Sequence, residues 1–428
     1  MSTTTLNSQS CQTLDDWLCY IEQSHPIDKI DLGLARVEAV AAKGQLQDLP
    51  GKKVLIAGTN GKGTTACCIE QLLLAQGATV GVYSSPHLLR FNERLRINGQ
   101  DVADDDWLAA FAFVEQLRGD VGLTYFEFTT LVSFYLLRQA KLDYCLIEVG
   151  LGGRLDATNI IQPDVSVITT IDLDHQDWLG NDRNVIGREK AGIFRSDSVA
   201  VIGELAIPDS VLAYADELKC TTCVLNTDYR YSVTDNGWHW RSADTSYNEL
   251  ALTAIPVQNV ACSLAVLQQL QRLPNIELLN AELKKLSLVG RMQWLQHQPD
   301  IILDVAHNPQ SAQYLAQQLT LLKPKYTRII TLVGMLKDKD IKQTLLPLLP
   351  IIDHWHLATL NGVRGATSEQ LTQALKSLSS TAAEVTLHSD VVCAFQQLKF
   401  QLQPDDLLVV FGSFVTVSAV LSEFKESL

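Results

Sequence analysis

Residues 51–65 read GKKVLIAGTNGKGTT, and this stretch decides the fold. Its apolar run at 54–57 is long enough for one buried strand. Three glycines follow, where a strand must turn sharply and bring its backbone close to a ligand. The next residues, 64–76, form a helical pattern that ends at Gly77. Strand, glycine loop and helix together predict a phosphate cradle at a helix N-terminus, to which Lys62 adds a positive charge.

The loop differs from the strict nucleotide-binding pattern G-x-x-x-x-G-K-[ST]. It reads GTNGKGT over residues 58–64, which is two residues shorter before the Gly-Lys pair. A glycine-rich turn without a ligand is the alternative interpretation, but it gives no role to three glycines beside Lys62. We therefore expect phosphate binding, with a hydroxyl of Thr64 or Thr65 able to reach a magnesium ion.

Composition sets limits on the class of protein. At 428 residues the chain exceeds the ~250–300 residues at which single cores stop growing, so two domains are expected. The net charge of −14 argues against nucleic acid or an anionic membrane as the main partner. Nine scattered cysteines, the lack of a signal peptide and the lack of a long apolar run indicate a cytoplasmic protein. No apolar patch stands out, which favours a monomer.

The alternation of strands, loops and helices predicts an α/β protein with parallel sheets. We expect a large P-loop-type ATPase domain over residues 1–295 and a smaller Rossmann-like domain over 296–428. Residues 200–255 are less regular and suggest a small β excursion. From residue 300 onward, five further strand–helix units fit a doubly wound sheet.

Ligands of such sheets bind at the carboxyl ends of the strands. In the first domain these ends carry Lys62, Ser85, Glu148 and His175. Glu148 lies in an otherwise apolar strand, so it needs a cation, either a basic side chain or magnesium. The acidic residues 172, 174 and 177 around His175 are either a solvated turn or a second cation site.

A series of motifs in a fixed order then resembles a known family. The motifs are AGTNGKGTT, YSSPHL, LTYFE, EVGLGGRLDATN, LDHQDWLG, GREKAGIFR, LVGRMQ, DVAHNP, GMLKDKD and RGATSEQL. Together they resemble the Mur ligase superfamily over about residues 14–420. Within it, TYFE with EVGLGGRLDATN resembles the bifunctional dihydrofolate synthases/folylpolyglutamate synthases.

The resemblance implies roles for individual residues. ATP phosphates would be held by Gly61, Lys62, Gly63 and Thr64, and the nucleotide would also contact Asn259, Arg291 and Asp304. One Mg²⁺ would be bound by Ser85 and Glu148, and a second by His175 with Lys190 as a carbamylated side chain. The pterin would contact Thr59, Asn60, Leu123, Thr124, Tyr125, Phe126 and Leu155. Catalytic roles would fall to Lys62, Lys190, His175 and His307, the last near the same cleft.

The implied reaction is ATP-dependent ligation of L-glutamate to dihydropteroate and to reduced folates through an acyl phosphate. Two alternatives remain open: a ligase for UDP-muramyl cell-wall precursors, and a nucleotide-binding switch without ligase activity. The phosphate loop starts near residue 58, which leaves little room for a uridine-binding domain before it. Val363 and Val415 stand where relatives carry Pro or His, which leaves open the preference for the glutamate chain.

Overall fold

The computed structural model describes residues 7–26, 31–378 and 384–426. The chain divides into two compact units. Unit 1 comprises Met1–Leu173 and Leu179–Leu286, and unit 2 comprises Asp174–Trp178 and Ser287–Leu428. Residues 287–295 therefore group with unit 2, whereas the sequence suggested a boundary after residue 295. The short segment at 174–178 groups with unit 2 although both its neighbours belong to unit 1.

The main sheet of unit 1 has eight strands in the order β4-β3-β2-β5-β1-β6-β7-β8. The strands are β1 (Lys52–Ala57), β2 (Val80–Tyr83), β3 (Leu95–Ile97), β4 (Gln100–Asp101), β5 (Tyr144–Glu148), β6 (Val165–Ile168), β7 (Val199–Ile202) and β8 (Thr221–Val224). All neighbours pair in parallel except β3 and β4, which form a hairpin at one edge. The alternating pattern of residues 90–102, with its Asn98-Gly99 turn, predicts a hairpin or meander there. The sequence predicts that the strands at 54–57, 80–84, 144–149 and 165–171 lie side by side. They correspond to β1, β2, β5 and β6, which are adjacent in the sheet. The α/β prediction is confirmed.

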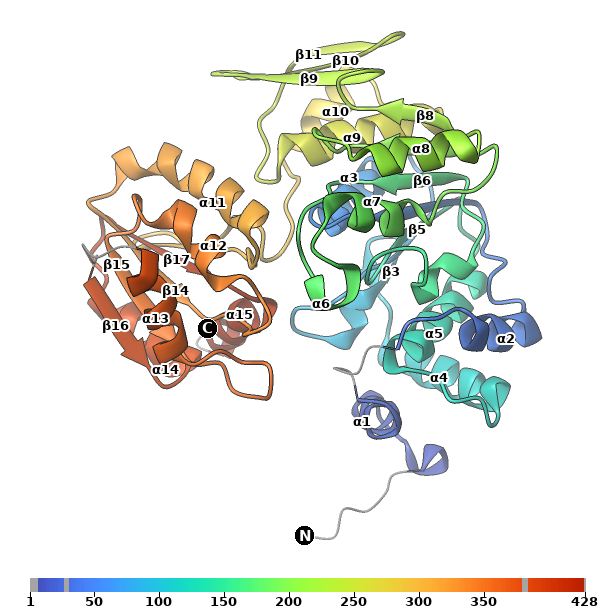
Figure 1. Cartoon of the computed structure of the whole chain (residues 1–428), viewed down its shortest axis with the longest axis horizontal. Coiled ribbons are helices and arrows are strands. Elements are labelled where there is room, and N and C mark those ends of the chain that lie inside the picture. The colour runs from blue at the N-terminus through green and yellow to red at the C-terminus, as the bar shows by residue number, and fades with distance from the viewer. Residues whose placement is uncertain (1–6, 27–30, 379–383, 427–428) are drawn as a thin grey trace. The chain divides into compact units, whose positions relative to one another are not determined.

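Helices cover both faces of this sheet, as the apolar strands require (Figure 1). One face packs on α1 (Leu14–Ser24), α2 (Ala35–Gly44), α4 (Asp104–Arg118), α5 (Tyr125–Gln139), α7 (Arg183–Ala191) and α8 (Asp209–Glu217). The other face contacts α3 (Lys62–Ala75) and α9 (Val257–Gln269), and α10 (Ile276–Leu283) packs on α3. The phosphate-loop helix is therefore held between the sheet and a second helix layer.

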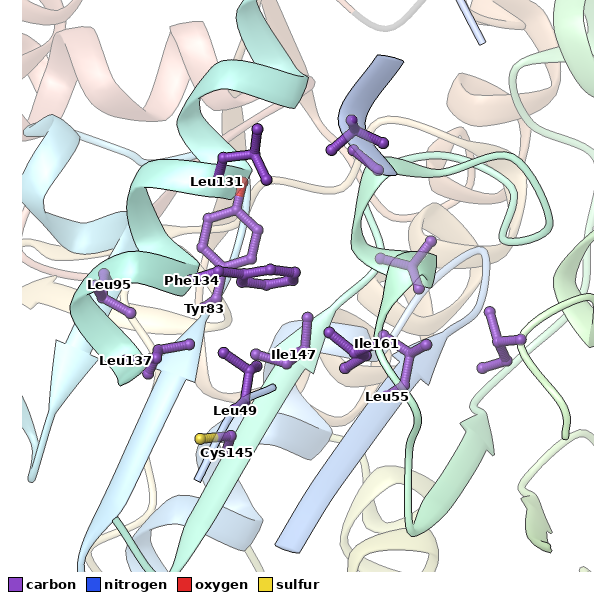
Figure 2. Packing of buried hydrophobic residues seen from close by; sticks show 14 of the residues in the cluster. Leu49, Leu55, Tyr83, Leu95, Leu131, Phe134, Leu137, Cys145, Ile147 and Ile161 are labelled. Carbon is purple, nitrogen blue, oxygen red and sulfur yellow. The ribbon is translucent and has the colours of Figure 1, made fainter. Parts of the chain in front are cut away.

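The core of unit 1 lies between the sheet and α5 (Figure 2). Leu55, Tyr83 and Ile147 come from three neighbouring strands and are fully buried. Leu131 and Phe134 of α5 pack against them in the same cluster. This packing fixes the strands whose carboxyl ends carry the predicted site residues.

Residues 200–255 are more regular than the sequence suggested. They include β7, β8 and α8 of the main unit, and then an antiparallel sheet of β9 (Tyr229–Thr234), β10 (Gly237–Ser242) and β11 (Ser246–Leu250). Trp240 of β10 is fully buried and donates from Nε1 to the carbonyl of Ala261 on α9, at 3.1 Å. The predicted β excursion is confirmed. This three-stranded sheet packs on α9, the helix that carries Asn259.

Unit 2 contains a six-stranded sheet in the order β12-β13-β17-β14-β15-β16. The strands are β12 (Gln293–Gln296), β13 (Asp300–Leu303), β14 (Arg328–Val333), β15 (His354–Ala358), β16 (Glu384–His388) and β17 (Asp406–Phe411). Helices α11 (Pro309–Leu322), α12 (Ile341–Leu345) and α13 (Ser368–Leu378) share one core with the sheet. Helices α14 (Val391–Gln401) and α15 (Phe414–Glu426) contact the sheet outside that core. The five parallel strands fit the predicted units, and the antiparallel edge strand β12 was not expected.

Two further expectations can be compared with the structure. The sequence pattern predicts a short aromatic segment at 123–128 before a helix, but α5 already begins at Tyr125 because Thr124 caps it with Glu127. The nine cysteines are free, as predicted. Within the described ranges, no helix combines the length and hydrophobicity that a membrane span needs.

Candidate active site

The glycine loop between β1 and α3 has the geometry of a phosphate cradle. Gly58 (φ 155°) leaves no room for a side chain, since a Cβ there would lie 1.9 Å from Thr169 Oγ1. Gly61 (φ 86°) is the N-cap of α3, and a Cβ there would lie 2.6 Å from Asn259 Oδ1. The backbone can therefore turn onto the helix N-terminus only with glycine at both positions.

The side chains of the loop are held by hydrogen bonds within unit 1. Lys62 Nζ donates to the carbonyl of Gly58 at 3.0 Å, so the lysine folds back over the loop. Thr64 Oγ1 donates to Gly61 O at 2.9 Å and accepts from Asn259 Nδ2 at 2.7 Å. The hydroxyl of Thr65 is fully enclosed and has no hydrogen-bond partner in the described chain, so it does not open towards a ligand. Asn259 thus lies beside the loop, although 195 residues separate it from Thr64.

The end of β6 fixes the first half of the loop. Thr59 N–H donates to Thr170 O at 2.8 Å, and Asn60 N–H donates to Thr170 Oγ1 at 3.0 Å. Thr169 Oγ1 donates to Asn60 O at 2.6 Å. Hydroxyls from a neighbouring strand therefore set the shape of the loop at Thr59 and Asn60.

Glu148 and Lys190 are buried charged residues of unit 1. Glu148 is the last residue of β5 and is 6% exposed. Its Oε2 lies 3.5 Å from the position of a Cβ at Gly63, so the carboxylate is beside the phosphate loop. Lys190 on α7 is 4% exposed. Ser85 follows β2, the strand next to β5, at the same edge of the sheet.

The predicted pterin residues surround the start of α5. Thr124 is its N-cap, and Leu123 and Tyr125 on either side are buried. Phe126 places its ring against the backbone of Gly150, where a Cβ would lie 2.5 Å from Cζ. Leu155 in the following loop is half-buried. The aromatic stretch thus belongs to a helix N-terminus that meets the loop after β5.

The loop after β5 also holds a carboxylate that the sequence did not single out. Asp156 is 3% exposed and accepts from the N–H groups of Leu151 (2.8 Å) and Thr158 (3.0 Å) and from the Thr158 hydroxyl (2.6 Å). Burial raises the pKa of Asp156 above its usual value, against the effect of these hydrogen bonds.

Unit 2 brings together Asp304, His307 and Arg291. Asp304 follows β13 and accepts from the N–H groups of Met292 (2.9 Å) and Ala306 (2.8 Å). Burial raises its pKa, and the nearby Arg291 opposes that rise. His307 Nδ1 lies 2.8 Å from Val305 O, and its ring is 6.1 Å from that of Phe414. Arg291 lies over the same Phe414 ring at 5.3 Å.

Asp174 organises a second polar group in unit 2. It is 2.6 Å from Lys339 Nζ, 3.3 Å from Asn308 Nδ2 and 3.7 Å from His307 Nε2. Burial would raise the pKa of Asp174, but His307 and Lys339 hold it well below its usual range. The next residue, His175, has a left-handed backbone (φ 51°), a strained conformation that often marks functional loops.

The acidic turn at 172–177 is the place of the expected second cation site. Among the described residues, no three His, Cys, Asp or Glu side chains are arranged to hold a metal ion. Asp174 is instead occupied by Lys339. A second cation site at this turn, like the pairing of His175 with Lys190, stays a prediction.

The predicted residues fall into two groups. Unit 1 contains the loop, Asn259, Glu148, Lys190, Ser85 and the pterin stretch, and unit 2 contains His175, Arg291, Asp304 and His307. Sequence reasoning missed Lys339 and Phe414. Lys339 lies in the quoted motif GMLKDKD. Its neighbours in the sequence are charged, so nothing in the motif indicates that Lys339 is buried.

The comparisons with known proteins agree on one family. The model for the Mur ligase middle domain matches residues 56–267, and the model for the Mur ligase glutamate ligase domain matches residues 290–414. The dihydrofolate synthase/folylpolyglutamate synthase of Escherichia coli strain K12 is 43% identical over 417 residues, which is 96% of each chain.

Solved structures are similar over nearly the whole chain. E. coli FolC in complex with DHPP and ADP has a TM-score of 0.92 at 41% identity, covering 99% of this chain and 100% of that one. A bifunctional folylpolyglutamate synthase/dihydrofolate synthase with Mn, AMPPNP and L-glutamate bound has a TM-score of 0.90 at 44% identity, covering 98% and 100%. The chain therefore belongs to the Mur ligase family and, within it, to the dihydrofolate synthases/folylpolyglutamate synthases, which are ATP-dependent ligases.

Proposed function

We propose that the protein joins L-glutamate to dihydropteroate, forming dihydrofolate, and adds further glutamates to reduced folates. The observation that carries the proposal is the phosphate cradle, with Lys62 folded over it and Asn259 beside it, in a chain of this family. ATP would be cleaved to ADP and phosphate. The N-terminal domain would bind ATP, and the C-terminal domain would act in glutamate ligation.

The proposed reaction has two steps. The substrate carboxylate attacks the γ-phosphorus of ATP, giving an acyl phosphate and ADP. The amine of L-glutamate then attacks the acyl carbon, forming the amide and releasing phosphate. Gly61, Gly63 and Thr64 would hold the phosphates with their N–H groups, and Lys62 would neutralise charge on the transferring group.

A divalent metal fits the donors of unit 1. Glu148 supplies a buried carboxylate beside the loop, and Ser85 lies at the neighbouring strand end. We assign one Mg²⁺ to this pair and a second to His175 with Lys190 as a carbamate, which would convert a buried amine into an oxygen ligand. Bound metal would offset negative charge on the phosphates. Exchange into bicarbonate-free buffer should lower activity, and added bicarbonate should restore it.

The remaining site residues have proposed contacts with the substrates. Arg291 and Asp304 would contact the nucleotide, and His307 would act at the same place. Thr59, Asn60, residues 123–126 and Leu155 would bind the pterin, with Phe126 stacking on its ring. No side chain is assigned as general base for the glutamate amine.

The experiment is phosphate release from MgATP with L-glutamate, adding dihydropteroate or tetrahydrofolate in turn. We expect each pterin to stimulate release only when glutamate is present. Stimulation by one of the two would reduce the proposal to a single activity. Stimulation by a UDP-muramyl substrate alone, or slow hydrolysis indifferent to glutamate, would contradict it in favour of a cell-wall ligase or a nucleotide switch.

The proposal also includes a monomer, because no apolar patch stands out in the sequence. It places the protein in the cytoplasm, because the nine cysteines are scattered and free. Light scattering coupled to size-exclusion chromatography should give the mass of one 47.3 kDa chain. A mass of two chains at micromolar concentration would contradict the monomer without affecting the reaction.

A further inference from the structure

Arg94 is a buried cation whose terminal amino groups are unused. It ends the short 3-10 helix Phe91–Arg94 and is 5% exposed. Its Nε donates to His87 Nδ1 at 2.9 Å. Within the described part of the chain, no carboxylate lies within 4.0 Å of its guanidinium, and Nη1 and Nη2 donate to no residue. Neither of these two atoms is fully enclosed by protein.

Two other buried charges in the same unit, Glu70 and Glu127, are paired with arginines. Arg96, two residues further on, forms a 2.6 Å ion pair with the buried Glu70. The buried Glu127 pairs with Arg36 at 3.1 Å. Glu93, the acid next to Arg94 in sequence, is occupied, since its carboxylate accepts from the N–H groups of residues 88–90. A buried guanidinium without an anion is costly, which indicates that its partner is a ligand.

The surroundings of Arg94 suit a flat aromatic carboxylate. The guanidinium lies 5.4 Å from the ring centre of Phe91 and 5.9 Å from that of Tyr125, the latter in the predicted pterin stretch. Arg94 O accepts from Ser84 N–H at 2.9 Å, which places its backbone beside Ser85. His87 uses its Nδ1 to accept from Arg94 Nε at 2.9 Å. The guanidinium is thus flanked by two aromatic rings and keeps its two terminal amino groups without a protein acceptor in the described part of the chain.

We propose that Arg94 binds the reacting carboxylate of the pteroyl substrate through Nη1 and Nη2. A guanidinium suits this role because its two amino groups match the two oxygens of a carboxylate. The contact would hold the carboxylate beside Ser85, where the proposed phosphoryl transfer takes place. With folate substrates, the same group would receive the carboxylate of the terminal glutamate. The inference rests on the proposed function and adds a substrate-binding residue to it.

The test compares Arg94→Met with Arg96→Met. Binding of dihydropteroate is followed by pterin fluorescence in the presence of MgADP, and thermal unfolding is followed without ligand. We expect Arg94→Met to bind about 10- to 100-fold more weakly, which is the usual effect of losing a hydrogen bond to a charged group. Its ligand-free Tm should be unchanged or higher, because an unpaired charge has been removed. Arg96→Met should lower Tm, because it leaves Glu70 unpaired.

An analogue that lacks the carboxylate completes the test. Wild type should lose affinity for the analogue by the same factor, whereas Arg94→Met should bind analogue and substrate equally. Arg94→Lys keeps the positive charge but lacks the two parallel amino groups of a guanidinium. It should therefore bind dihydropteroate more tightly than Arg94→Met and more weakly than wild type. If Arg94→Met does not fold, Arg94→Lys and the analogue on wild type still decide the matter.

Two results would overturn the proposal. One is wild-type affinity in Arg94→Met, and the other is equal wild-type affinity for substrate and analogue. Wild type that binds neither dihydropteroate nor a reduced folate would instead contradict the proposed function itself.

Discussion

At the scale of single residues, Lys62 is the clearest test of the phosphate cradle. Lys62→Met should lower the rate of phosphate release by about 10²–10³-fold, because a charge aimed at the transferring group is lost. The fold should persist, since the lysine's one described hydrogen bond is to its own loop at Gly58. Lys284→Met, at an exposed position, is the matched control. Equal rates of phosphate release in the two variants would contradict a role for Lys62 in phosphoryl transfer.

Asp174 and Lys339 make a second prediction at this scale, on stability. Asp174→Asn should destabilise unit 2 by about 3–5 kcal/mol, because it leaves the 6% exposed Lys339 side chain buried without its anion. Replacing both, with Lys339→Met added, should recover most of the loss. Urea unfolding of the two variants measures this difference, and equal instability of the single and double variants would contradict the pairing.

At the scale of elements, β15 and β16 carry three histidines on one face. His356 is 4% exposed, its Nδ1 lies 2.9 Å from His388 Nε2, and its ring stacks on His354 at 4.1 Å. Burial and the two neighbours lower the pKa of His356 to about 3, and burial lowers the pKa of His354 and His388 too. Glu384 and Asp390 act in the opposite sense, and Arg328 in the same sense.

A pH dependence of stability follows from these shifts. Because the unfolded state takes up protons near pH 6.5 and the folded state does not, stability is complete above pH 6.5 and falls as the pH drops towards 3. The loss due to His356 should be at most about 1.4 kcal/mol per pH unit. Hydrogen exchange of peptides covering β15 and β16 should accelerate between pH 7 and 5 after correction for intrinsic rates. His356→Gln should weaken this effect, and an unchanged dependence in that variant would contradict it.

The helices and strands also show which features of the fold and the site could be predicted from the sequence. The glycine loop, the grouping of four strands around it and the place of Glu148 in a buried strand followed from local patterns, because glycine spacing and apolar runs report backbone geometry directly. The start of α5 was misplaced because a capping box overrode the strand-like look of its aromatic residues. Arg94 could not be found at all, and the pairing of Asp174 with Lys339 could not be predicted, because whether a charge has a partner depends on residues far away in the chain.

At the scale of the whole molecule, chain length predicts two domains, and the structure has two compact units. The expected boundary after residue 295 and the observed grouping from residue 287 differ because β12 pairs with β13. The segment at 174–178 could not be assigned to unit 2 from sequence, since its neighbours belong to unit 1.

The prediction for the whole molecule is that bound nucleotide stabilises the folded chain in a Mg²⁺-dependent way. MgATP at about 100 times its Kd should stabilise the folded chain by about 2.7 kcal/mol, and EDTA should remove most of that gain. Thermal unfolding with ATP, with MgATP and with MgATP plus EDTA measures it. A rise in Tm that is identical with and without Mg²⁺ would contradict a metal beside the nucleotide.

The most direct measurement of the central claim uses dihydropteroate labelled with ¹⁸O in its carboxylate. If the substrate carboxylate attacks ATP to form an acyl phosphate, one labelled oxygen must leave with the phosphate when glutamate forms the amide. We predict one ¹⁸O per phosphate released, as measured by mass spectrometry. Unlabelled phosphate alongside a glutamylated product would contradict activation of the carboxylate by ATP.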